Sequence, residues 1–325
     1  MLRTNNACDD PYLQNLNCVD FAPVFITGLH RSGTTILYKL LSESGAFNTC
    51  TVHHVVYRYC LLYLHLNVLE AQAKEELEQQ LESLEQRSRG FDTIGVSAET
   101  PEEYCYALAH QGRRPMLNDE NFPSFLEFCK KLQFIQSRDK SLLLKNPFDS
   151  ANFLYIKDRL PDSRFVFIHR HPVEVINSQV KAVWSLLKRK NEYVALIVER
   201  YRQLWEHPGK LWLARKVFSE RLPFIVPQVV SNVSRENQRL LTDIGRLPEE
   251  SYIHVTYSQL CDDPNNRIAE ILDFLQVTPA QRPDSLAHIK KRPVELAPGV
   301  AKRIPQILRK NSAYCKRFGL GQSYA

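Results

Sequence analysis

A glycine-containing string near the N-terminus, FITGLHRSGTT (residues 25–35), has the residue types of an anion-binding loop. It follows a short β-branched run and precedes a helical pattern. In such a turn the backbone N–H groups converge on one point, and the helix dipole adds positive potential. The string therefore predicts a phosphate cradle. Its candidate ligand-binding residues are His30, Arg31, Ser32, Gly33, Thr34 and Thr35.

The glycine spacing matches the nucleoside-triphosphatase loop G-x-x-x-x-G-K-[ST], with Gly28 and Gly33 in the two glycine positions. The lysine of that motif is absent, because Thr34 stands in its place. Since that lysine normally reaches the β- and γ-phosphates, its absence argues against ATP or GTP hydrolysis. The loop suits a ligand with one phosphate at this position.

A second string, RFVFIHRHP (164–172), also reads as a strand that ends at an arginine and leads into a helix. Ser178 lies two turns along that predicted helix. Arg170 is well suited to phosphate, because a guanidinium can bind it through two parallel hydrogen bonds. Together the two strings favour a ligand with two separate phosphates.

The Arg-Ser-Gly-Thr-Thr string resembles the 5′-phosphosulfate loop of sulfotransferases that use 3′-phosphoadenosine 5′-phosphosulfate (PAPS), in particular the tyrosylprotein and bacterial branch. The resemblance extends from about residue 22 to about residue 320 and is weakest over 185–250. It implies that Arg170 and Ser178 bind the 3′-phosphate. His171 stands where the family usually has aspartate, and we expect it to add positive charge near that phosphate.

The resemblance implies in-line sulfuryl transfer to a hydroxyl or amine, with release of 3′,5′-ADP (PAP) and no metal. Such transfer needs cations for the developing charge. Lys145, in a Lys-Asn-Pro-Phe string, matches the catalytic lysine of the tyrosylprotein branch, and Arg31 is the second candidate cation.

A base must also take the acceptor proton. The tyrosylprotein branch has a glutamate about 21 residues beyond the loop arginine, but here that position is Val52. The neighbouring His53 and His54 are therefore the predicted bases, with a slight preference for His53, since histidine is a competent base near neutral pH. Glu99 and Glu102 are the alternatives.

The elements that position these residues alternate along the chain. Strands are predicted at 23–28, 141–145, 164–170 and 252–257. Helices are predicted at 33–44, 68–90, 123–136, 151–161, 172–190, 268–277 and 301–318. Alternation of this kind predicts an α/β fold, a mostly parallel sheet flanked by helices. We expect a leader at 1–20 and a single sulfotransferase domain at 21–325, with specificity helices within 50–140 and 185–250.

Composition limits the partners. The net charge of +6 is spread along the 325 residues, which favours a pocket for a polyanionic small molecule over nucleic acid. The eight cysteines lack metal-site spacing, and the N-terminus lacks a signal-peptide core. We expect a cytoplasmic monomer or homodimer with reduced thiols, no membrane partner and a soluble acceptor such as a natural product. The alternatives are a kinase-like phosphotransferase and a non-catalytic nucleotide-binding protein on the same fold.

Overall fold

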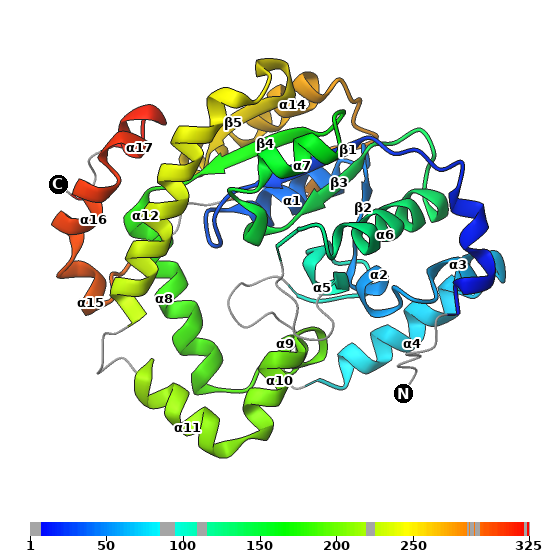
Figure 1. The fold of residues 1–325 in the computed structure, drawn as a ribbon, viewed down its shortest axis with the longest axis horizontal. Coiled ribbons are helices and arrows are strands. Elements are labelled where there is room, and N and C mark those ends of the chain that lie inside the picture. The colour runs from blue at the N-terminus through cyan, green and yellow to red at the C-terminus, as the bar shows by residue number, and fades with distance from the viewer. Residues whose placement is uncertain are drawn as a thin grey trace.

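The computed structural model describes residues 8–84, 95–108, 116–218, 225–284, 286, 289, 293–321 and 324. At its centre lies a five-stranded sheet in the order β2-β3-β1-β4-β5, and every neighbouring pair is parallel (Figure 1). The strands are β1 (Pro23–Thr27), β2 (Asn48–Thr49), β3 (Leu142–Lys145), β4 (Arg164–His169) and β5 (Tyr252–Thr256). The predicted α/β fold is thus confirmed.

Helices surround this sheet on both faces (Figure 1). Their bounds are α1 (Thr34–Glu43), α2 (Val52–Val56), α3 (Leu61–Leu66), α4 (Glu70–Glu82), α5 (Cys105–Leu108), α6 (Phe122–Ile135), α7 (Phe153–Arg159), α8 (Pro172–Lys188), α9 (Glu192–Ile197), α10 (Glu199–Glu206), α11 (Pro208–Val217), α12 (Ile225–Asp243), α13 (Tyr257–Asp262), α14 (Pro264–Leu275), α15 (Pro298–Ala301), α16 (Ile304–Lys310) and α17 (Ser312–Arg317).

The inner strands are apolar on both faces because both are covered. In β1, Val24 and Ile26 join the hydrophobic cluster shared with α1 and α14, whereas Phe25 joins the cluster of α6 and α7 on the opposite face. A third cluster packs α8 against α12 and α16, outside the sheet. These three cores fix the carboxyl ends of β1, β3 and β4 next to one another, where ligands bind in open α/β sheets.

The elements differ from expectation at the two ends of the chain. Within the expected leader, a 3-10 helix (Asp10–Leu16) buries Leu16, and Asp9 forms a buried ion pair of 2.9 Å with Lys131 of α6. The single helix expected at 301–318 is divided into the end of α15, α16 and α17. Pro305, which lacks an N–H, lies in the first turn of α16, and Asn311 separates α16 from α17.

The interior of the chain also holds elements that were not predicted. The two-residue strand β2 was missed. Helices α9 to α12 lie within 185–250, where specificity helices were expected but no individual helix was predicted. The helix expected at 68–90 is present as α4 up to Glu82, and the end of that prediction lies outside the described residues.

Candidate functional site

The phosphate loop joins β1 to α1, and its backbone conformation depends on two residues with positive φ. Gly33, which precedes the first residue of α1, has φ +110°, and Arg31 has φ +73°. A Cβ on Gly33 would come within 2.6 Å of the ring of Tyr257. Glycine is therefore required there on two grounds, the left-handed backbone and the contact with Tyr257.

The loop is tied to helix α8, so the two predicted phosphate sites form one surface. Arg31 donates from Nε to the Ser178 hydroxyl at 2.9 Å, and Arg170 donates to the carbonyl oxygen of Arg31 at 3.2 Å. Gln179 donates to the carbonyl of His30 at 2.8 Å. The structure thus brings together Arg31, Arg170 and Ser178, because β1 and β4 are adjacent strands whose carboxyl ends coincide.

Arg170 is held in place by two further contacts. Its Nε lies 2.7 Å from a carboxylate oxygen of Glu174, one turn along α8. Its guanidinium also lies 4.3 Å from the ring centroid of Tyr257, in cation–π geometry. Both contacts orient a planar cation at the mouth of the loop.

Two polar atoms of the loop are buried and have no hydrogen-bond partner among the described residues. These are His30 Nε2 and the hydroxyl of Ser32. A buried polar group that lacks a partner costs free energy, so native proteins rarely leave one without a ligand or water. Unpaired donors in a glycine turn at a helix start fit a phosphate or sulfate group.

Lys145 lies on the other side of the loop, at the end of β3, and is fully buried. Its Nζ lies 2.9 Å from the Glu103 carboxylate and donates to the Thr35 hydroxyl at 3.0 Å. Burial lowers the pKa of the neighbouring His30; Glu103 opposes this shift, whereas Lys145 and Arg31 add to it. The loop therefore has one cation on the β3 side and a second cluster of cations on the β4 side.

Glu103 is the site residue that sequence reasoning missed, although its neighbour Glu102 was an alternative base. The segment is fixed by backbone bonds from Glu102 N to the Cys50 carbonyl and from Tyr104 N to the Lys145 carbonyl. These bonds leave Glu103 against Lys145, while Glu102 accepts a hydrogen bond from Tyr193 of α9. The sequence feature that could have pointed to Glu103 is the pair of adjacent glutamates, Glu102 and Glu103, in a stretch without a helical pattern.

His53 and His54 lie in helix α2, among different neighbours. The His53 ring packs against Tyr57, with centroids 5.0 Å apart. His54 accepts a hydrogen bond from the backbone N–H of Thr51, which caps α2. Burial and the charge of Lys74 together lower the pKa of His53 to about 4, although Glu99 opposes the shift. Burial, followed by the charges of His53 and Lys74, lowers the pKa of His54 to about 3. Their electrostatic neighbours are thus Lys74 and each other, with Glu99 near His53.

His171 caps helix α8 and does not add the positive charge that was expected near the phosphate. Its Nδ1 accepts a hydrogen bond from Val173 N at 3.3 Å, which requires an unprotonated nitrogen. Burial lowers the pKa of this imidazole below its usual value, although Glu174 opposes the shift. The imidazole at this position therefore serves as the N-cap of α8.

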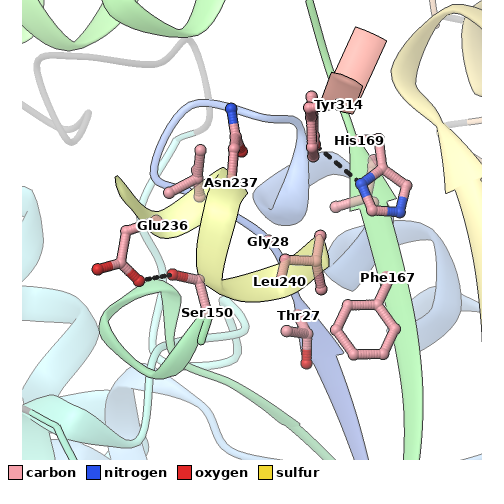
Figure 2. Close-up of a pocket in the computed structure, with 11 residues that line it drawn as sticks. Thr27, Gly28, Ser150, Phe167, His169, Glu236, Asn237, Leu240 and Tyr314 are labelled. Carbon is pink, nitrogen blue, oxygen red and sulfur yellow. Dashed lines mark hydrogen bonds between the residues drawn. The ribbon is translucent and has the colours of Figure 1, made fainter. Parts of the chain in front are cut away.

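A pocket lies beside the loop, between the ends of β1 and β4 and the helices α12 and α17 (Figure 2). Its wall includes Glu236, which accepts a hydrogen bond from Ser150 at 3.5 Å, and Tyr314, whose hydroxyl lies 2.9 Å from Nδ1 of His169. The cations Arg31, Lys145 and Arg170 do not line it. The pocket therefore adjoins the charged site without being part of it.

Among the described residues, no group of three or more histidine, cysteine, aspartate and glutamate side chains is arranged to hold a metal ion. The candidate phosphate-binding side chains are cationic or hydrogen-bond donating, and Glu103 and Glu174 hold two of the cations in place. They are suited to a polyanionic ligand.

The sequence profile of the Sulfotransferase family matches residues 23–218, which include the loop, Lys145, Arg170 and Ser178. The chain belongs to this family. Omega-hydroxy-beta-dihydromenaquinone-9 sulfotransferase Stf3 of Mycobacterium bovis is 27% identical over 218 residues, and so is its counterpart of Mycobacterium tuberculosis. The match covers 57% of this chain and 54% of the relative, so it spans about half of the relative's length.

Two solved structures share the fold of this family member. Sulfotransferase STF9 from Mycobacterium avium superposes with a TM-score of 0.66 at 14% identity, over 96% of this chain and 80% of the other. Sulfotransferase STF1 from Mycobacterium tuberculosis superposes with a TM-score of 0.56 at 16% identity, over 94% of this chain and 80% of the other. At these identities the likeness concerns the fold.

Proposed function

We propose that this member of the sulfotransferase family transfers a sulfuryl group from PAPS to a hydroxyl of a small-molecule acceptor and releases PAP. The observation that carries the proposal is the pair of hydrogen bonds that link Arg31 to Ser178 and to Arg170. It unites a phosphate loop that has unpaired buried donors with a second cationic site one strand away. A ligand with separate 5′ and 3′ anionic groups matches that arrangement.

In this proposal the loop and Arg31 bind the 5′ side of the nucleotide, while Arg170 and Ser178 bind the 3′-phosphate. Lys145 and Arg31 stabilise the negative charge that develops on the leaving group. Thr35, which accepts a hydrogen bond from Lys145, keeps the ammonium directed toward the loop. Cations that are held in place in this way stabilise a developing negative charge most strongly when the site is buried, because the local dielectric constant is low.

Glu103 is the better candidate for the base that accepts the acceptor proton. Its carboxylate lies against Lys145, and it belongs to the same electrostatic cluster as His30 and Arg31. The sequence-based candidates, His53 and His54, remain alternatives. In helix α2 they lie beside Tyr57, Thr51 and Lys74 rather than Lys145, so their position supports them less than that of Glu103.

The acceptor is proposed from one relative. The name of the Stf3 relative describes an omega-hydroxy quinone, which supports a hydroxyl acceptor over an amine. The rival functions predict different ligands: a kinase-like enzyme would prefer ATP with Mg²⁺, and a non-catalytic protein would bind PAP without any transfer.

The test is isothermal titration of the full chain with PAP in the absence of Mg²⁺, alongside 5′-AMP and ATP. We expect PAP to bind more tightly than AMP by about 10–100-fold, since the 3′-phosphate adds charge-assisted hydrogen bonds. Arg170→Ala should remove most of this advantage. Arg246→Ala is the matched control, because Arg246 is exposed on the surface and contacts Asp243.

Equal affinity for PAP and AMP, or tighter binding of ATP, would overturn the two-phosphate site. If PAP binds as expected, the chain is incubated with ³⁵S-labelled PAPS and a panel of alcohols and amines. Release of PAP with label in an alcohol supports the proposed reaction. PAP binding without transfer to any acceptor favours the non-catalytic alternative.

A further inference from the structure

Helix α11 has a face that no other part of the described structure covers. We call this the α11 outer face and define it by Lys210, Trp212, Leu213, Lys216 and Val217. Figure 1 shows α11 at the edge of the molecule, away from the sheet. Trp212 and Leu213 are more than half exposed, at 57% and 56%, and Val217 is 38% exposed.

The opposite side of α11 is attached to the protein. Leu211 is its only buried residue, and Arg215 donates from Nε to the carbonyl of Leu187 in α8 at 2.8 Å. Successive residues in a helix are separated by 100°, so Leu211 and Arg215 share the inner side. Trp212, Leu213, Lys216 and Val217 consequently face outward, with Lys210 beside Leu213 and Val217.

The charge on this helix has one sign. Residues 207–218 contain Lys210, Arg215 and Lys216 and no aspartate or glutamate. Lys216 lies one turn after Trp212, and its Nζ is 4.1 Å from the indole ring centroid. The cations are therefore interleaved with the exposed apolar side chains.

This pattern distinguishes between two kinds of occupant. The buried centre of a protein–protein interface is depleted of lysine, because each ammonium would lose its hydration. At a lipid surface, in contrast, apolar side chains enter the acyl boundary while lysines extend to the anionic headgroups, and tryptophan favours the interface. We propose that the α11 outer face docks the protein onto an anionic lipid surface.

Docking of this kind is peripheral. In the part of the chain that the structure describes, no helix has the length and hydropathy needed to cross a bilayer. Helix α11 has ten residues, about 15 Å, and would lie in the plane of the membrane. The proposal differs from the sequence-based expectation of no membrane partner, which was drawn from composition and from the lack of a signal-peptide core.

The test is flotation of the full chain with vesicles of phosphatidylcholine, with or without 30% phosphatidylglycerol, at 0.05 and 0.5 M NaCl. We expect binding to the anionic vesicles that falls at least fivefold without phosphatidylglycerol and falls again at high salt. The Trp212→Ser/Leu213→Ser and Lys210→Glu/Lys216→Glu variants should each lose at least tenfold in binding. Val68→Ser is the control, because Val68 is 89% exposed elsewhere on the surface.

Failure to float with anionic vesicles, or flotation unchanged in both double variants, would overturn the proposal. Sedimentation velocity tests the alternative that the α11 outer face binds a second copy of the chain. If the protein is a dimer and Trp212→Ser/Leu213→Ser converts it to a monomer, the occupant of this face is a second copy and the lipid proposal is wrong. PAP titration and circular dichroism establish that each variant is folded. Vesicle binding requires no turnover, so its outcome is independent of the proposed function.

Discussion

The ion pair between Glu103 and Lys145 gives the most direct test at the scale of the residue. Glu103→Gln keeps the shape of the side chain and removes its capacity to take a proton. We expect kcat to fall about 10²–10⁴-fold, the usual contribution of a general base, while PAP affinity changes little because the phosphates bind elsewhere. Steady-state rates with saturating PAPS, with PAP titration in parallel, measure the two effects separately.

Histidine variants are the matched comparison for this prediction. His53→Gln and His54→Gln each remove one imidazole of the sequence-based candidates. If Glu103 is the base, both variants retain a kcat within a few-fold of the wild-type value. A loss of 10²-fold in either histidine variant, with Glu103→Gln near wild type, would assign the base to helix α2.

Candidate site residues could be selected from the sequence where they lie close together in one continuous motif, and not where distant segments bring them together. Arg31 and the hydroxyls of the loop lie in one continuous string, and Arg170 and Ser178 are separated by a fixed helical spacing. Glu103 approaches Lys145 only because its segment pairs with Cys50 and with the end of β3. No local pattern encodes such a contact between distant segments, so sequence reasoning did not select Glu103. Counting along the chain gave His53 and His54, which stay a prediction.

At the scale of the element, the junction of the loop with α1 depends on Gly33. Gly33→Ala combines a φ of +110° with a Cβ 2.6 Å from Tyr257, whose ring also supports Arg170. We expect unfolding free energy to fall by about 1–3 kcal/mol and PAP affinity to fall at least tenfold. Urea unfolding and PAP titration measure these effects.

Gly245→Ala is the control for this prediction, because a Cβ there meets nothing within 4 Å and the backbone needs no positive φ. It should change stability by less than about 0.5 kcal/mol. If Gly33→Ala resembles this control in both measurements, then the loop tolerates a side chain and its described conformation is not required for binding.

A strong apolar period made some elements predictable but did not suffice for all, since α12 was not predicted individually although it buries Val226, Val230 and Val233 at helical spacing. Helices α6 and α8 were predicted within two residues at each end, because their apolar positions recur with helical spacing. Helix α11 buries only Leu211, so it has no apolar stripe of the kind that marks a helix packed on a core. Strand β2 is two residues long, too short for an alternating pattern.

At the scale of the whole molecule, burial of neutral histidines predicts sensitivity to acid. Burial lowers the pKa of six described histidines below the usual 6.5: His30, His53, His54, His169, His171 and His254. As the pH falls below about 6.5, the unfolded chain binds protons before the folded one. Each such histidine then costs about 1.4 kcal/mol of stability per pH unit until its folded pKa is reached.

We therefore expect the urea midpoint to be constant between about pH 7 and about pH 8, below the ordinary pKa of a thiol, and to fall steeply between pH 6.5 and pH 4. Asp149 opposes this fall, since burial raises its pKa. Replacing the partly buried His254 by glutamine should make the slope shallower, whereas replacing His207, which is exposed, should change it less. A midpoint that stays constant down to pH 5 would contradict the prediction.

The strand order of the sheet has a consequence for how the chain is made. Strand β1 is complete by Thr27, but its partners β3 and β4 begin at Leu142 and Arg164. A ribosome that adds roughly 5–20 residues per second needs on the order of ten seconds to supply the first partner. During this interval the apolar β1 has no strand to pair with, so the nascent chain depends on chaperones or on early packing with α1. Slowing translation before Leu142 should therefore increase aggregation more than slowing it after His169.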